Sequence, residues 1–134
     1  MFFSYMKKEF NYLKKNNQYF PVINVVLQGP KRTEIFTALI DSGASFSVFR
    51  PEVAEVLGIQ IEKGKQIYLE GIGGRILGYI HEVNLAIGKK FFKCKIVFSK
   101  ELTISFNLLG RNNFFKPFII SFFEKSKKVI LGEL

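Results

Sequence analysis

The chain has 134 residues, of which 48% are hydrophobic, and its formal net charge is +9. This length fits a single domain with a buried core, and the apolar content excludes a disordered chain. The charge is compatible with an anionic partner, but the lysines are dispersed along the chain, so we favour a solvated basic surface.

Residues 1–18 mix lysines, asparagines and aromatic residues, and we treat them as a basic and aromatic extension preceding a domain at residues 19–134. Apolar side chains recur there at near-helical spacing: Phe3, Met6, Phe10 and Leu13. Three alternatives stay open for this segment: a short amphipathic helix, a partner-binding arm or a frayed tail.

The domain is predicted to consist mainly of strands. Its β-rich segments, bounded by glycine, proline or charged turns, are residues 22–27, 33–40, 45–49, 66–70, 76–80, 82–87, 91–98, 104–109, 118–123 and 128–131. Residues 59–65 are expected to be a connection with a partial strand pattern. The last two segments form a C-terminal hairpin.

One helix is clearly indicated at residues 51–58. Pro51 stands at its start, Glu52 in its first turn and Gly58 at its end. Val53, Val56 and Leu57 are expected to share its buried face. A second helical turn is expected to begin at residues 114–115, before Pro117.

Cys94 is the only cysteine, so no intramolecular disulfide can form, and this favours a reducing compartment. In the alternating segment 91–98 it shares a face with Phe92, Ile96 and Phe98, which indicates a core thiol rather than a nucleophile. No apolar run reaches the roughly 18 residues of a membrane span, and no signal peptide is recognisable. We therefore predict a soluble, cytoplasmic protein.

Asp41 ends the apolar segment 33–40 and is the only aspartate in the chain. A carboxylate at the end of a buried strand is costly unless another group pairs with it or shares its proton. Ser42 adds a hydroxyl, and Gly43 allows the backbone to turn sharply. By itself, an Asp-Ser-Gly sequence is most often a turn or a helix cap.

The hairpin 66–80 has a glycine-rich tip, Gly71-Ile72-Gly73-Gly74. A phosphate-binding loop is not favoured, since no helix with Lys-Ser/Thr follows it. Both a moving lid and an ordinary tight turn fit this tip.

The two halves of the chain follow one plan. In the first half, Ile23-Asn24-Val25 opens a hairpin that leads to Leu39-Ile40-Asp41-Ser42-Gly43; in the second half, Val83-Asn84-Leu85 opens one that leads to Leu108-Leu109-Gly110. A helix candidate follows each glycine-containing corner. The pattern predicts an internal pseudo-two-fold repeat in which only the first half carries a carboxylate at its corner.

Three motifs occur in order: Asp41-Ser42-Gly43-Ala44, Gly71-Ile72-Gly73-Gly74 and Asn107-Leu108-Leu109-Gly110-Arg111-Asn112. Together they resemble the retropepsin-like aspartic proteases, the single-domain, homodimeric relatives of pepsin, over roughly residues 21–115. The resemblance implies an all-β fold: a closed barrel with one short helix, a pseudo-two-fold repeat and a C-terminal hairpin.

The resemblance also implies roles for individual residues. Asp41 is the catalytic aspartate of an active-site loop that includes Ser42, Gly43 and Ala44, and the Ser42 hydroxyl braces the two active-site loops against each other. The flap tip consists of Gly71, Ile72, Gly73 and Gly74. The substrate pocket is lined by Ala44, Val48, Ile72, Phe106 and Leu108, and the loop is supported by Leu109, Gly110 and Arg111. No cofactor or metal is implied, and the single histidine, His81, has no cluster of partners around it in the sequence.

One position departs from the retroviral enzymes, which carry an aspartate where this chain has Ser45. In those enzymes that aspartate pairs with the arginine of the Gly-Arg-Asn motif. Arg111 therefore needs another partner: a glutamate, carbonyl oxygens or a neighbouring chain.

A proteolytic mechanism makes a strong demand on this sequence. Peptide hydrolysis needs an activated water and an acid, which two adjacent carboxylates sharing one proton can provide. A chain with one aspartate supplies half of such a pair, so this mechanism requires a two-fold homodimer acting on an extended peptide. Two alternatives stay open: a non-catalytic, dimeric peptide-binding scaffold of the same fold, and a nucleic-acid binder using the lysine-rich N-terminus.

Overall fold

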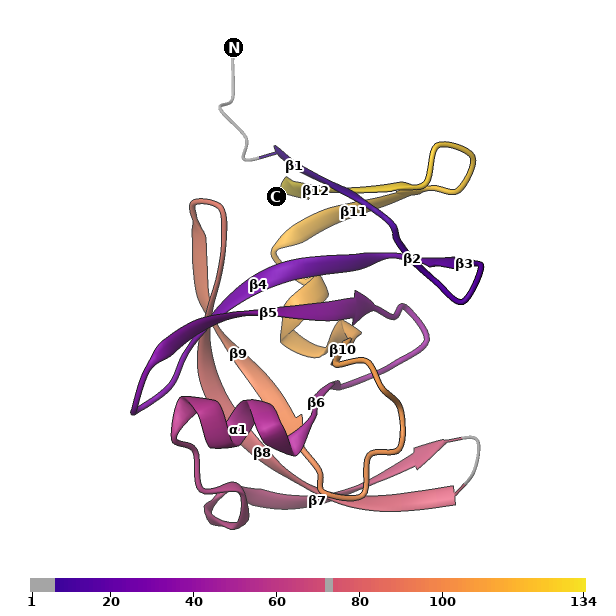
Figure 1. The fold of residues 1–134 in the computed structure, drawn as a ribbon. Helices are drawn as coiled ribbons and strands as arrows, with labels where there is room; N and C mark the ends of the chain where they lie inside the picture. The colour runs from indigo at the N-terminus through magenta and orange to yellow at the C-terminus, as the bar shows by residue number, and fades with distance from the viewer. Residues whose placement is uncertain (1–6, 72–73) are drawn as a thin grey trace.

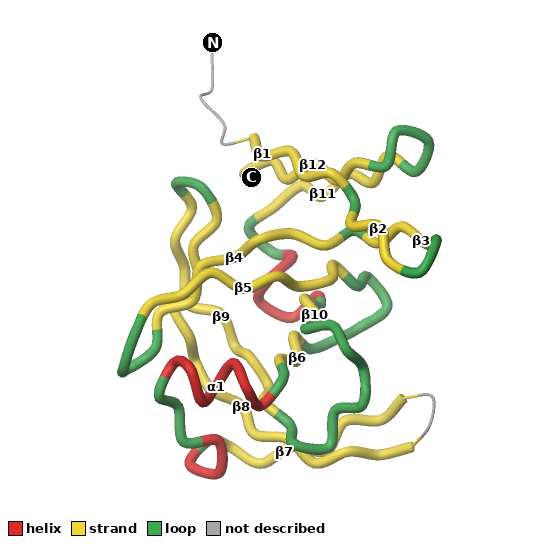
Figure 2. Tube along the Cα trace, in the orientation of Figure 1, coloured by secondary structure: helices red, strands yellow, loops and turns green. Residues whose placement is uncertain are grey.

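The computed structural model describes residues 7–71 and 74–134. Its backbone forms a seven-stranded sheet, a three-stranded sheet and a separate two-stranded hairpin (Figures 1 and 2). The seven strands are, in spatial order, β4 (Val22–Gln28), β5 (Thr33–Ile40), β10 (Leu108–Leu109), β6 (Ser47–Phe49), β9 (Lys90–Phe98), β8 (Gly74–Ile87) and β7 (Lys65–Gly71). Because β4 also pairs with β8, the first six of these strands close into a barrel, and β7 extends from its rim.

The remaining elements surround this barrel. The three-stranded sheet has the order β1 (Lys7–Asn11), β12 (Lys128–Glu133) and β11 (Phe118–Phe123), and β2 (Leu13–Lys15) pairs with β3 (Gln18–Phe20). The helical segments are α1 (Pro51–Leu57), η1 (Ile61–Lys63) and the kinked η2 (Arg111–Phe115), in which Asn112 and Asn113 have non-helical backbone angles. No helix within the described ranges is long and apolar enough to cross a lipid bilayer.

The barrel core follows the alternation visible in the sequence. Along β4, Ile23, Val25 and Leu27 are buried, whereas Asn24 and Gln28 are exposed. Successive side chains of a strand point to opposite faces, so one face of β4 lines the core and the other meets solvent. The largest fully buried side chains include Phe49, Phe98, Phe114, Ile23, Leu27, Leu57, Leu85, Ile96 and Leu109.

The predicted pseudo-two-fold repeat is confirmed by the strand pairing. β6, from the first half, runs parallel to β9 of the second half, and β10, from the second half, runs parallel to β5 of the first. β6 and β10 meet antiparallel, with Val48 opposite Leu108. Each of these short strands leads into a helical segment, so the counterpart of Leu108–Leu109 is Ser47–Phe49 rather than residues 39–40.

Helix α1 confirms the helix predicted at residues 51–58. Its C-cap residue, Gly58, has a left-handed φ of 80°, a conformation that glycine adopts without a Cβ penalty. Val53, Ala54 and Leu57 are buried, but Val56 is 37% exposed, so its assignment to the buried face is wrong. Residues 53, 54 and 57 lie on one side of a helix with 3.6 residues per turn, so Ala54, rather than Val56, completes the buried face.

The N-terminal segment is extended rather than helical. Lys8 lies opposite Leu131, and Phe10 opposite Val129, so β1 completes its backbone hydrogen bonds on the edge of the C-terminal hairpin. Asn16 and Asn17 have positive φ angles of 51° and 60° and form the turn between β2 and β3. The amphipathic-helix alternative is therefore wrong for residues 7–18, and Phe3 and Met6 of that pattern lie outside the described residues. The proposed boundary after residue 18 falls within β3.

Several further segments differ from expectation. The strand expected at residues 104–109 is only two residues long, because residues 104–107 instead form polar contacts with α1 and β5. The connection 59–65 contains η1. The segments 76–80 and 82–87 join into the single strand β8, which pairs with β7 through its first half and with β9 through its second.

Candidate active site

Asp41 is delivered to the surface by a strand that is held on both sides. At the end of β5, Leu39 lies opposite Val22 of β4 and opposite Leu108 of β10. The Asp41 main-chain nitrogen then donates a hydrogen bond to the Leu109 carbonyl at 2.9 Å. The two-sided pairing fixes the point at which the chain leaves the barrel and turns.

The loop that follows orients the carboxylate with its own backbone. The Gly43 N–H donates to Asp41 Oδ1 at 2.9 Å, and the Ala44 N–H donates to the Asp41 carbonyl at 3.1 Å. The carboxylate is half-buried, whereas Ser42 and Gly43 are exposed. A Cβ on Gly43 would lie 3.3 Å from Oδ1, so a side chain there would crowd the carboxylate.

The segment after β10 packs directly beneath this loop. The Arg111 N–H donates to the Ala44 carbonyl at 2.9 Å, and the Asn112 N–H donates to the Ser45 carbonyl at 2.7 Å. The Gly110 N–H donates to the buried Ser47 hydroxyl at 3.0 Å. A Cβ on Gly110 would overlap the carbonyl of Phe46, so only glycine allows this approach of the two chains.

The Arg111 side chain has a partner that the sequence did not indicate. Its Nη2 donates a hydrogen bond to Ser45 Oγ at 3.3 Å. Ser45 stands at the position where the resemblance implied an aspartate, so a neutral hydroxyl occupies the place of the carboxylate. Both residues are exposed.

The predicted pocket residues divide into two groups. Val48 and Leu108 face each other across the pseudo-two-fold and are nearly buried. Phe106 is half-buried, and its ring lies 5.0 Å from that of Phe20, centroid to centroid. Ala44 belongs to the Asp41 loop and is half-buried.

The predicted flap is the hairpin of β7 and β8. Gly71 and Gly74 are paired at its outer end, and Ile72 and Gly73 lie outside the described residues. Figure 1 shows the outer ends of β7 and β8 on the same side of the molecule as the loop that follows β5.

Comparison with known proteins decides the family. The sequence profile of a family described as Aspartyl protease matches residues 23–112, a span that runs from β4 through the Asp41 loop to η2. The chain belongs to the aspartyl protease family. No curated protein sequence matches it significantly.

Solved structures show that this member of the aspartyl protease family has a retropepsin-like fold. A retropepsin-like aspartic protease from Rickettsia conorii is 20% identical, with a TM-score of 0.65 over 99% of this chain and 97% of the other. EIAV protease in complex with the inhibitor HBY-793 is also 20% identical, with a TM-score of 0.55 over 74% of this chain and 88% of the other. At this identity the likeness establishes the fold.

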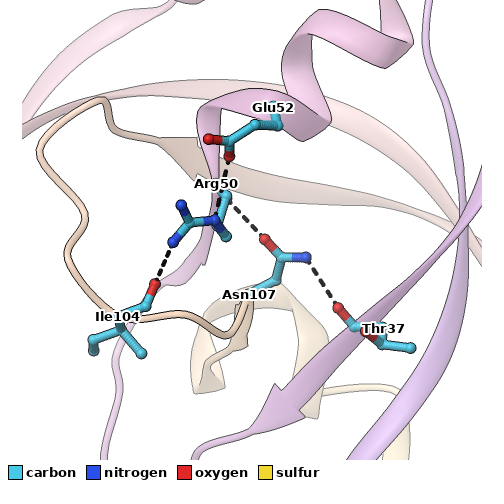
Figure 3. A network of polar contacts seen from close by, with 5 residues as sticks. All are labelled: Thr37, Arg50, Glu52, Ile104 and Asn107. Carbon is cyan, nitrogen blue, oxygen red and sulfur yellow. Dashed lines mark hydrogen bonds and ion pairs between the residues drawn. The ribbon is translucent and has the colours of Figure 1, made fainter.

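An additional residue that supports the Asp41 strand emerges from the structure (Figure 3). Asn107 Oδ1 accepts a hydrogen bond from the Arg50 main-chain nitrogen at 2.8 Å, and Asn107 Nδ2 donates to the Thr37 carbonyl at 3.0 Å. The Asn107 carbonyl accepts a third bond, from the Leu39 N–H at 2.7 Å. Asn107 thus ties the strand bearing Asp41 to the start of α1. An amide directly before a buried aliphatic pair was the available sequence signal, but its partners are distant in sequence.

The Arg50 side chain completes the same network. Its Nη1 donates to the Ile104 carbonyl at 2.6 Å, and its Nε lies 3.2 Å from a Glu52 carboxylate oxygen (Figure 3). These contacts hold residues 104–107 against the beginning of α1. The loop that carries Phe106 is therefore anchored at both ends.

Two other chemically reactive side chains, Cys94 and His81, have structural contacts of their own. Cys94 is fully buried, as predicted; burial raises the pKa of its thiol to about 12, although a hydrogen bond with Ser47 acts in the opposite direction. His81 Nε2 lies 2.8 Å from the Ile61 carbonyl, which it can satisfy as a donor. Across residues 7–71 and 74–134, no group of three or more His, Cys, Asp or Glu side chains is placed to hold a metal ion.

Proposed function

We propose that this protein is an aspartic endopeptidase in which two Asp41 carboxylates, one from each subunit of a homodimer, activate the hydrolytic water. The observation that carries this proposal is the setting of Asp41. It is the only aspartate of the chain, it belongs to a chain of the aspartyl protease family, and its loop is held on β10 by main-chain hydrogen bonds.

The chemistry follows from pairing two such carboxylates. Two carboxylates close together cannot both ionise comfortably, so the pair keeps one proton. The ionised Asp41 takes a proton from water as the water attacks the scissile carbonyl, which the protonated Asp41 polarises. A proton is then delivered to the leaving nitrogen, and no covalent intermediate forms. Because the pair titrates as a unit, we expect activity on the acidic to near-neutral side.

The remaining residues take supporting roles in this proposal. Ser42 braces the two active-site loops, Gly43 lies beside the substrate main chain, and residues 71–74 form a flap. The pocket for apolar side chains is formed by Ala44, Val48, Ile72, Phe106 and Leu108. The loop is supported by Leu109, Gly110 and Arg111. The proposal places catalysis in residues 19–134, with 1–18 as an extension, and the lone buried cysteine suits a cytoplasmic location.

The test is cleavage of quenched fluorescent peptides by wild-type protein and by Asp41→Asn. The asparagine keeps an acceptor for the Gly43 N–H, so we expect the fold and the dimer to persist while cleavage is lost. Glu34→Gln, an exposed change on β5, is the matched control and retains activity. Sedimentation velocity reports the dimer.

A mixing experiment tests the shared site directly. If each site needs Asp41 from both subunits, an excess of Asp41→Asn should draw wild-type chains into inactive mixed dimers and suppress activity. Cleavage that persists in Asp41→Asn would falsify the proposal. Peptide binding by wild-type protein without cleavage between pH 4 and 7 would instead favour the scaffold alternative.

A further inference from the structure

The hairpin β2–β3 packs against the loop that carries Phe106. Lys15 Nζ lies 3.2 Å from Ser105 Oγ and 5.0 Å from the centroid of the Phe106 ring. The Phe20 ring, at the end of the hairpin, lies 5.0 Å from the same ring. An ammonium group thus lies over one ring of a packed aromatic pair.

This aromatic surface adjoins the strand that delivers Asp41. Pro21, directly after Phe20, accepts a hydrogen bond from the Ile40 N–H at 2.9 Å. Asn107, directly after Phe106, accepts one from the Leu39 N–H at 2.7 Å. Pro21 and Asn107, which follow the two aromatic residues, therefore accept hydrogen bonds from the last two residues before Asp41. Figure 1 shows β2–β3 projecting on the same side of the molecule as the loop after β5.

The hairpin carries positively charged side chains that lie near aromatic rings. Two further ammonium groups lie near the Tyr19 ring, Lys14 at 5.8 Å and Lys127 at 5.3 Å from its centroid. None of the ion pairs between described residues includes Lys14, Lys15 or Lys127. A cation near an aromatic face and a neutral hydroxyl remains available to an incoming carboxylate.

We propose that Lys15 is a specificity-determining residue that binds an acidic side chain of the peptide substrate. This inference rests on the proposed function, because it takes Phe106 as a wall of the substrate cleft. In an extended peptide, side chains two positions apart project on the same side, about 6.6–6.8 Å from each other. Lys15 Nζ lies 5.0 Å from the Phe106 centroid, which is shorter than that spacing by less than the reach of an Asp or Glu side chain. Lys15 therefore selects Asp or Glu two positions from the apolar residue held against Phe106.

The homodimer extends this selectivity to both sides of the scissile bond. A two-fold axis gives each half of the cleft its own Lys15. The preferred substrate class is then a peptide with apolar residues at its centre and an acidic residue on each flank. An exposed ion pair contributes up to about a five-fold preference, so we expect roughly two- to five-fold selectivity for each acidic side chain.

The experiment compares peptides that differ only in Glu, Gln or Lys at this position. Their cleavage gives kcat/KM with the wild-type protein, and their binding to Asp41→Asn, followed by fluorescence anisotropy, gives Kd without cleavage. We expect the wild-type order Glu, then Gln, then Lys, and its reversal by Lys15→Glu. Lys89→Glu, an exposed position in the turn between β8 and β9, makes the same charge change away from the hairpin and keeps the wild-type order.

The outcomes separate this inference from the function on which it rests. If Asp41→Asn binds peptides in the expected order but the wild-type protein cuts none, the endopeptidase proposal fails and the role of Lys15 stands. If Lys15→Glu and Lys89→Glu leave the same order, or if no peptide binds, the role of Lys15 is overturned. It is also overturned if Lys15→Glu weakens only the binding of a fluorescent single-stranded oligonucleotide, because the hairpin would then be a phosphate-binding surface.

Discussion

Asn107 and Arg50, 57 positions apart in sequence, are joined by a hydrogen bond of 2.8 Å from the Arg50 main-chain nitrogen to Asn107 Oδ1. The same amide group donates to the Thr37 carbonyl at 3.0 Å. One side chain therefore connects β5, the start of α1 and the segment before β10. Of these, β5 leads into the Asp41 loop, and α1 follows that loop in the chain after β6.

Replacing Asn107 should destabilise the protein. Asn107→Ala removes both side-chain bonds, and Asn107→Asp keeps the acceptor but replaces the donor with an oxygen facing the Thr37 carbonyl. We expect each change to lower the free energy of unfolding by about 1–3 kcal/mol, measured by urea denaturation. Asn24→Ala, on the exposed face of β4, is the control and should change it by less than about 0.5 kcal/mol. Equal effects at the two positions would contradict the bridging role.

Gly110 should not tolerate even one methyl group. In Gly110→Ala the new Cβ overlaps the Phe46 carbonyl, so the Asp41 loop must move. We expect a loss of about 1–3 kcal/mol in the free energy of unfolding, together with weaker peptide cleavage. In Gly132→Ala the new Cβ would lie 3.8 Å from the Ile119 Cβ, an ordinary contact. This control should unfold at nearly the wild-type temperature in calorimetry. If both variants lost a similar amount of unfolding free energy, the close approach of Gly110 to the Phe46 carbonyl would be contradicted.

The contact of Arg111 with Ser45 should strengthen when a charge is restored. Ser45→Asp places a carboxylate beside the guanidinium, but both positions are exposed, so the gain should be only about 0.2–1 kcal/mol. The gain should appear as a higher melting temperature at low salt and vanish near 1 M salt, where charges are screened. Ser45→Asn enlarges the side chain about as much as Ser45→Asp does but adds no charge, so it separates the effect of charge from that of size. A gain that is independent of salt would point to a cause other than ion pairing.

Cys94 should be unreactive in the native protein. Burial raises the pKa of its thiol from the ordinary value of 9.0 to about 12, so the folded state holds this proton more tightly than the unfolded state. The stabilisation is present in full below the unfolded pKa and is lost as pH rises from about 9 to about 12, by about 1.4 kcal/mol per pH unit. Cys94→Ala should lack this component of the pH dependence. Thiol reagents at pH 8 should label Cys94 only after unfolding, and rapid labelling of folded protein would refute the assignment.

Much of this fold is encoded in local sequence patterns. Several of its features depend only on residues that are neighbours in sequence. They are the alternation along residues 22–27 and 91–98, the proline and glycine around α1, and each of the three ordered motifs. For this reason the barrel strands, the helix and the position of Asp41 at a strand end could be predicted before the fold was known.

Two of the differences from expectation lie where a segment finds its partner far along the chain. Residues 7–11 have a weak helical pattern, but the open edge of the hairpin β11–β12 satisfies their backbone groups better. Residues 104–107 look like a strand, yet Asn107 and the Arg50 side chain hold them in a loop.

The sequence by itself determined that Asp41 ends a buried strand before a glycine turn and that the chain can offer only half of an aspartate pair. Only the tertiary structure decided that Ser45 is the partner of Arg111, that Asn107 ties three segments together, and that Lys15 lies beside Phe106. The physical reason is that a hydrogen bond or a cation over a ring depends on distances of a few ångströms between residues 57 to 91 positions apart, and no local pattern encodes such distances.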